Sequence, residues 1–190
     1  MVAATTNDSS LVSLGKLKVG GYIYWAPAAT KLPTDASTAL PADYKPLGYL
    51  SEDGVTISTD TDTTEVKDAN GNTVLKTISS YAENYQFALI EVMRAEAAKL
   101  RYGSTAVTGE DKKMTIRHRM PDDEEFILVF EIAMTGDVKD RLVVGKCTRS
   151  EFGDRQVHSG DAQSYDVTVA AGDMGDGVTA IEYIGISATK

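Results

Sequence analysis

The sequence has one cysteine, Cys147, and two histidines, His118 and His158, in 190 residues. A lone cysteine allows no intrachain disulfide, and no Cys/His spacing matches a zinc site. Neither histidine is accompanied by a nucleophile-elbow motif, so we expect a surface or strand-pairing role for His118. Cys147 is expected to be a small buried hydrophobe. We therefore expect no enzymatic activity and no cofactor.

Basic residues and long apolar runs are also scarce. The chain has 19 Lys and Arg against 28 Asp and Glu, and its formal net charge is −9. This balance disfavours nucleic-acid binding through phosphate neutralisation. No segment approaches the roughly 20 apolar residues of a membrane span, and residues 1–6 lack the basic and apolar parts of a signal peptide. We expect a soluble protein made in the cytoplasm, with no membrane partner.

Three acidic segments are candidate cation sites. Asp60–Glu65 and Asp68–Asn72 resemble calcium loops. Both lack the glycine at position six and the glutamate at position twelve that an EF-hand requires. Asp173 and Asp176 lie in a glycine-rich turn that could hold a cation weakly, although a solvated turn is the commoner use of such a segment. We therefore expect no bound metal.

The sequence does contain many runs in which apolar and polar residues alternate, which is typical of strands. In residues 125–134, for example, Phe126, Leu128, Phe130 and Ile132 share one face. The turn-forming sequence at 68–72 predicts a hairpin, and the sequence at 52–54 predicts a second turn. The other predicted strands are 19–25, 47–51, 55–58, 63–67, 73–77, 78–88, 114–119, 142–148, 165–170 and 178–186.

Residues 89–102 have a different period. Leu89, Met93, Ala97 and Leu100 fall on one helical face, and Gly103 follows as a C-cap. We therefore predict one helix over 89–102 beside about ten strands. This is a mainly β fold, a sandwich or barrel with one flanking helix.

Two segments do not fit the strand pattern. Residues 1–18 are small and polar, and they are predicted to form an N-terminal arm on a single β-rich domain, 19–190. Residues 26–46 hold four of the five prolines. A loop of this length inside a compact domain is uncommon and tends to be functional or disordered. We predict a long extended loop there.

Three motifs follow one another along the chain: Leu-Pro-Thr-Asp at 32–35, Leu-Gly-Tyr-Leu-Ser-Glu-Asp-Gly-Val at 47–55, and a predicted helix that ends in Leu-Arg-Tyr-Gly at 100–103. In order and spacing the chain resembles the major tail tube proteins of long, non-contractile-tailed bacteriophages, closely over residues 18–103 and loosely beyond. Relatives often have a tryptophan-containing hairpin where this chain has 68–72.

The resemblance implies a structural virion protein. Six copies would form a ring, and stacked rings would form a tail tube with a shared inner β-barrel that conducts DNA. The tape measure protein and DNA would lie inside without sequence-specific binding, and tail tip and terminator proteins would bind the ends. The ring-stacking loop would contain Lys31, Leu32, Pro33, Thr34, Asp35 and Tyr44. An acidic bore would repel phosphates within about 8 Å.

The residues leave two other hypotheses open. One is another virion β-sandwich, such as a decoration or head–tail joining protein, which would form discrete small oligomers. The other is a carbohydrate-binding or glycoside-acting jelly roll. It would need a concave aromatic face built from Tyr22, Tyr24, Trp25 and Tyr49. With Tyr44 these residues form a local aromatic group, for which core or interface packing is the commoner use.

Overall fold

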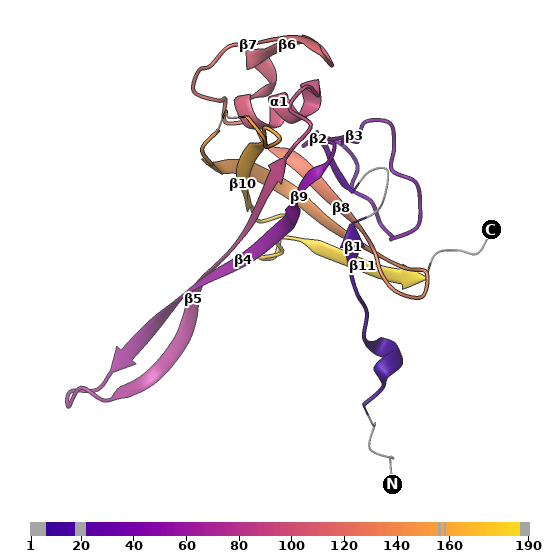
Figure 1. The fold of residues 1–190 in the computed structure, drawn as a ribbon. Helices are drawn as coiled ribbons and strands as arrows, with labels where there is room; N and C mark the ends of the chain where they lie inside the picture. The colour runs from indigo at the N-terminus through magenta and orange to yellow at the C-terminus, as the bar shows by residue number, and fades with distance from the viewer. Residues whose placement is uncertain (1–6, 18–21, 156, 158, 187–190) are drawn as a thin grey trace.

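The computed structural model describes residues 7–17, 22–155, 157 and 159–186 (Figure 1). These residues form one α-helix, two short 3₁₀ segments at Ser9–Leu11 and Ser104–Ala106, and eleven strands. The helix is α1 (Ala95–Tyr102). The strands are β1 (Lys16–Leu17), β2 (Ile23–Pro27), β3 (Lys45–Pro46), β4 (Leu50–Lys67), β5 (Thr73–Leu89), β6 (Val107–Glu110), β7 (Lys113–Ile116), β8 (Phe126–Ala133), β9 (Val138–Phe152), β10 (Tyr165–Ala171) and β11 (Ile181–Ile186).

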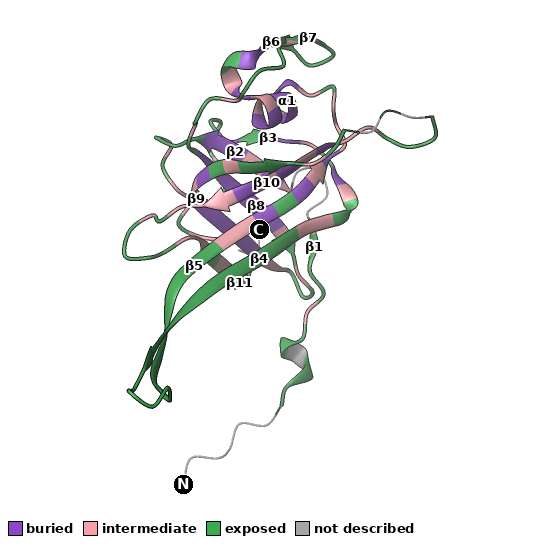
Figure 2. Ribbon diagram, turned by 90° about the vertical axis from the view of Figure 1, so that its left-hand side faces the viewer, coloured by how far each residue is buried: buried purple, intermediate pink, exposed green. Residues whose placement is uncertain are grey.

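Nine strands form one antiparallel sheet in the order β3-β2-β8-β9-β10-β5-β4, with β1 paired to β8 and β11 paired to β9. The sheet curls, so that the base of β4 and β5 packs over β8 and β9 around one large apolar core (Figure 2). β6 and β7 form a separate ribbon beside α1. The predicted mainly β fold with one flanking helix is confirmed.

The alternation along β8 explains how the sheet is covered on both faces. Phe126, Leu128 and Phe130 point into the large core, whereas Ile127 and Val129 belong to a second, smaller cluster on the other face. The first six residues of β8 are all buried. A strand buried on both faces reads as a continuous apolar run, as this one does.

The helix is shorter than predicted. Leu89 belongs to β5, where it is the register partner of both Leu50 and Tyr165, and Met93 is 61 % exposed. The helix begins only at Ala95, whose backbone N–H donates to the Asp111 carboxylate at 2.8 Å. The helical spacing of residues 89–94 in the sequence was therefore coincidental, because ladder pairing holds Leu89 in the sheet.

The predicted hairpin turn at Asp68–Asn72 is confirmed. Gly71 has a φ of +85°, and the Asp68 carboxylate accepts backbone N–H groups from Asn70 and Asn72 at 2.9 and 2.8 Å. The predicted turn at 52–54 is wrong. β4 runs through these residues, and its register against β5 shifts between Leu50 and Val55. A bulge absorbs the extra residues there, so the chain bends without reversing.

The remaining strand predictions were largely right. In β2, Ile23 and Trp25 point into the large core and Tyr24 points to the opposite face. Val19, where the predicted strand 19–25 begins, lies outside the described residues. The ribbon strand β6 was not predicted, and β9 extends well beyond the predicted 142–148 at both ends.

Candidate assembly surfaces

The β4–β5 hairpin projects from the body of the molecule (Figures 1 and 2). Every residue from 56 to 82 is exposed. β10 pairs with β5 only between Asn84 and Leu89, so both outer edges of the ribbon are unpaired beyond that point in the described chain. Unpaired edges present N–H and C=O groups to any strand of another molecule, and an isolated two-stranded ribbon is only marginally stable.

The hairpin is acidic, yet its end contains apolar groups. Residues 50–89 include seven Asp and Glu and two Lys, so they contribute −5 of the net charge of −9. Val66, Val74, Leu75 and Ile78, near the turn, are 49–64 % exposed. We call residues 65–78 the hairpin tip.

The predicted long loop is present, but it lies back against the sheet. Tyr44 is 4 % exposed and packs with Ala26 and Val143 on the face opposite the large core. The Tyr44 hydroxyl donates to the Lys31 carbonyl at 3.0 Å. The loop therefore forms a second covering layer over β8 and β9.

A buried ion pair fixes this layer. Arg141 and Glu131 are each 3 % exposed, and Nε and Nη2 of Arg141 both lie 2.6 Å from Oε1 of Glu131. Nη1 of Arg141 donates to the Asp35 carbonyl at 2.7 Å. The Asp35 carboxylate accepts hydrogen bonds from Thr38 and Ser37, which hold its pKa well below the usual range. Asp35, the last residue of the Leu-Pro-Thr-Asp motif, thus begins a bend at residues 35–38 and fastens the loop to the sheet through its backbone carbonyl.

The structure brings the predicted loop residues together. Lys31 and Thr34 are exposed and Leu32 is half-buried. With Pro33 and Asp35, these residues line a pocket of about 170 Å³ beside Arg141. Tyr44 is buried beneath them and shapes the loop. Contact of this loop with another copy remains a prediction.

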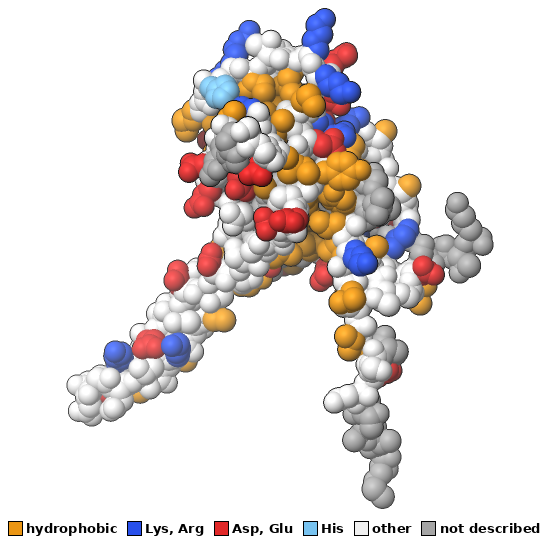
Figure 3. All heavy atoms as spheres, viewed as in Figure 1, with side chains coloured by type: hydrophobic (Ala, Val, Ile, Leu, Met, Phe, Trp, Pro, Cys, Tyr) orange, Lys and Arg blue, Asp and Glu red, His pale blue; other side chains and the backbone are white. Residues whose placement is uncertain are grey.

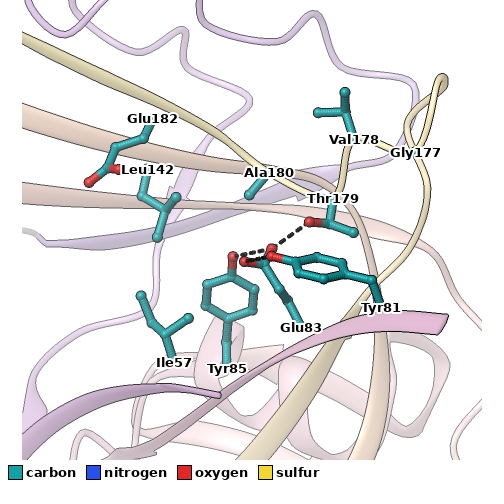
Figure 4. Close-up of a pocket in the computed structure, with 10 residues that line it drawn as sticks. All are labelled: Ile57, Tyr81, Glu83, Tyr85, Leu142, Gly177, Val178, Thr179, Ala180 and Glu182. Carbon is teal, nitrogen blue, oxygen red and sulfur yellow. Dashed lines mark hydrogen bonds between the residues drawn. The ribbon is translucent and has the colours of Figure 1, made fainter. Parts of the chain in front are cut away.

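The body is closed at one end by α1, whose Ala97, Ala98 and Leu100 are fully buried. Away from the helix, the base of the hairpin and the C-terminal strand enclose a pocket of about 590 Å³ (Figure 4). Glu83 lies inside it and accepts hydrogen bonds from Tyr81, Tyr85 and Thr179. The pocket is lined by Ile57, Tyr81, Glu83, Tyr85, Leu142, Gly177, Val178, Thr179, Ala180 and Glu182.

An adjoining pocket of about 500 Å³ shares Ile57 and Leu142 with the first. We call the two pockets together the open end. Figure 3 shows hydrophobic side chains gathered on the body between the hairpin base and the N-terminal segment. The adjoining pocket is lined by Gly15, Lys16, Leu17, Gly54, Val55, Ile57, Phe130, Ile132 and Leu142.

A buried acid lies beside the open end. Asp140 is 7 % exposed, and its Oδ1 has no hydrogen-bond partner. Its register partners are Ile132 on β8 and Ile184 on β11, and the Glu182 carboxylate is close enough to affect its pKa. Burial, and secondarily Glu182, raise the pKa of Asp140 to about 6.

Asp140→Asn is expected to make the isolated subunit more stable at pH 7 and to flatten its stability between pH 4 and 6. The pKa of Asp140 is raised in the folded state, to about 6 from 3.8, so the unfolded chain releases the proton first as the pH rises. The unfolding free energy therefore falls as the pH rises from 3.8 to about 6, and it stays low at higher pH. Urea unfolding against pH measures this, with the exposed Asp137→Asn as control. Parallel curves for wild type and Asp140→Asn would contradict it.

The described cysteine and histidine, Cys147 and His118, lie in different surroundings. Cys147 is fully buried, as predicted, and burial raises the pKa of its thiol. His118 is exposed, as predicted, and its ring lies 4.7 Å from that of Tyr102. His158 lies outside the described residues.

The candidate cation segments are accounted for by local structure. Residues 60–65 are part of β4 and do not form a loop. The Asp68 carboxylate is used within its own hairpin turn, and Asp173 accepts the N–H groups of Gly175 and Gly177. In the described ranges, no three His, Cys, Asp or Glu side chains are grouped to hold a metal ion.

The local aromatic group does not form a single surface. Trp25 is 7 % exposed and donates through Nε1 to Glu96 at 2.8 Å, whereas Tyr24 points to the other face of the sheet. Tyr22 and Tyr49 form a separate ring pair at 5.9 Å. The concave aromatic face required by the carbohydrate-binding hypothesis is therefore not formed.

Comparison with solved structures gives distant matches. The chain is 10 % identical to a chain of the PVC sheath–tube complex, an extracellular contractile injection system in its extended state, with 88 % of this chain and 90 % of that chain covered and a TM-score of 0.42. It is 11 % identical to a chain of the tail of an empty gene transfer agent particle, with 88 % and 95 % covered and a TM-score of 0.40.

Comparison of sequences is more informative about the family. No curated protein matches the chain. Within the described residues, no helix has the length and apolar character needed to cross a membrane. Residues 4–188 match a family model described as phage tail tube protein. The chain therefore belongs to the phage tail tube protein family and is a structural component of the virion tail, not an enzyme.

Proposed function

We propose that six copies of this chain close a ring, and that stacked rings form the tube of a long, non-contractile tail. The observation that carries the proposal is the hairpin, whose two edges are unpaired between residues 58 and 83. In a monomer such edges are a liability, whereas in a closed ring they become joints. Because the hairpin and the surfaces it would meet belong to different parts of the chain, the contact is head-to-tail and can close into a ring.

The charge of the hairpin supports a channel for DNA. Six copies of −5 place −30 on the hairpins of one ring. Phosphates near such a surface are repelled within a screening length of about 8 Å, so DNA slides without sticking. The tape measure protein fills the same bore before ejection, and terminator and tail tip proteins bind the two ends.

Two further segments are proposed to connect one ring with the next. The loop presents exposed Lys31 and Thr34 above the layer that Tyr44 and Arg141 hold in place. The N-terminal arm, residues 1–18, is the second connector. In its described part, Leu11, Val12 and Leu14 are 74–82 % exposed and contact no core of their own subunit.

Purified protein is expected to form rings or hollow tubes in electron micrographs when it is concentrated or seeded. Lys31→Glu with Thr34→Glu is expected to leave rings intact and to shorten or abolish the tubes, because only the proposed ring-stacking contact is changed. Discrete small oligomers without tubes would favour a head–tail joining or decoration protein. A species that stays monomeric in every such condition would rule out the tube.

A further inference from the structure

The open end exposes side chains that a closed sandwich would cover. Ile57 is 49 % exposed, Val178 40 %, Ile184 62 % and Ile186 76 %. Ile57 and Val178 line the pocket of Figure 4, and Ile184 and Ile186 follow on β11. Large apolar side chains left exposed around a pocket are typical of a contact with another molecule.

In the described chain, no cation pairs with the acids at or beside the open end. Asp140 is buried with one carboxylate oxygen unpartnered, and Glu182 is its charged neighbour. Among the described residues that line the pocket of Figure 4, two are acidic and none is basic. Lys16 lines the adjoining pocket but forms no ion pair with either acid in the described chain. A buried carboxylate without a counter-charge is costly, and a cation from outside would relieve that cost.

The hairpin tip has the complementary features. Besides its exposed apolar side chains, the tip contains Lys67 and Lys76, the only cations between residues 50 and 89. Lys67 has no ion pair in the described part of the chain. Lys76 lies 3.1 Å from Glu65, but both side chains are exposed, and exposed pairs hold their partners weakly.

The reach of the hairpin fits the size of the body. From Ile57 to Lys67 the strand extends for about 33 Å at 3.3 Å per residue. A body of roughly 150 residues is about 38 Å across. The hairpin is therefore nearly as long as the body is wide, so its tip comes close to the open end of a copy placed beside it, and the same step can repeat from copy to copy.

We propose that the open end is the docking site for the hairpin tip of a second copy, whose Lys67 and Lys76 pair with Asp140 and Glu182. This assignment rests on the proposed tube and specifies one contact within it. The apolar tip covers Ile57 and Leu142, and the incoming ammonium group supplies the missing counter-charge. The isolated subunit is then left with a destabilising acid that assembly neutralises.

The N-terminal arm of a second copy is the competing occupant. Leu11, Val12 and Leu14 could also cover an apolar surface. However, residues 7–15, the described part of the arm that precedes β1, contain Asp8 and no lysine. An arm in this position would leave Asp140 without a counter-charge, so the tip is the better match.

Disulfide cross-linking tests the contact directly, because the native Cys147 is fully buried and gives little background. Full-length protein with Glu182→Cys and Lys67→Cys is expected to give a ladder of cross-linked oligomers when tubes are oxidised. Glu182→Cys with Lys113→Cys, which lies on β7, is the matched control and should give none. A ladder from Glu182→Cys with Leu14→Cys instead would overturn the proposal in favour of the arm.

Charge reversal provides a second measurement. Lys67→Glu with Lys76→Glu is expected to raise the protein concentration needed for assembly at least tenfold, whereas Arg at both positions and Lys113→Glu should leave it nearly unchanged. Wild-type tubes with neither the ladder nor this effect would refute the docking contact and leave the tube proposal standing. Absence of wild-type rings or tubes would refute both.

Discussion

Arg141→Ala is expected to lower the unfolding free energy of the subunit by about 3–5 kcal/mol, the range found when one partner of a buried ion pair is removed. Arg141 and Glu131 are each 3 % exposed, so the variant leaves a carboxylate buried without its counter-charge. It also removes the hydrogen bond from Arg141 to the Asp35 carbonyl, which fastens the loop to the sheet.

Urea unfolding of the dispersed subunit at pH 7 measures the first effect. Limited proteolysis between residues 28 and 44 measures the second, because a loop that loses its anchor is cleaved faster. A loss of less than about 1 kcal/mol would show that the pair is solvated in solution, contrary to its burial in the structure.

The matched control replaces both partners, as Glu131→Leu with Arg141→Met. Apolar residues of similar volume in place of a buried pair are often neutral or stabilising, so the unfolding free energy should recover. Proteolysis of the loop should remain fast, because no side chain then donates to the Asp35 carbonyl. This separation distinguishes the role of the pair in core stability from its role in loop placement.

The fold was predictable where the sequence of a single strand indicates which of its faces are buried. In β8 the alternation of Phe126, Leu128 and Phe130 with Ile127 and Val129 shows a strand buried on both faces. Predictions failed where a long-range partner decides the conformation. The ladder pairing of Leu89 with Leu50 and Tyr165 overrides a local helical period, and nothing within residues 89–94 indicates it.

The assembly surfaces were predictable only in part. Prolines marked the loop, and Glu131 within the apolar run of β8 was a usable sign that a buried partner exists. Its partner Arg141 lies on the next strand, and only the register identifies it. The open end arises from the curl of the whole sheet, which brings Ile57 of β4 beside Leu142 of β9, so no local sequence pattern encodes it.

Shortening the hairpin is expected to abolish tube formation while the subunit stays folded. Thr61 and Tyr81 are register partners, so residues 62–80 can be replaced by Asn-Gly, which suits a two-residue hairpin turn. Every residue removed is exposed, and Glu83 keeps its hydrogen bonds to Tyr81 and Tyr85. Thermal unfolding should therefore stay close to that of the full-length chain, whereas electron micrographs should show no rings or tubes.

A full-length control separates the backbone of the hairpin from its side chains. Val66→Thr with Leu75→Thr keeps both edges and removes apolar surface, so it should weaken assembly without abolishing it. Mixed with full-length copies, the shortened chain can still bind a neighbour's hairpin tip at its open end, but it has no tip that can bind the next copy. Because a head-to-tail contact needs both halves in every copy, each shortened chain should interrupt a ring. Normal tubes containing the shortened chain would mean that the hairpin is dispensable, and the unpaired edges would then no longer support the tube.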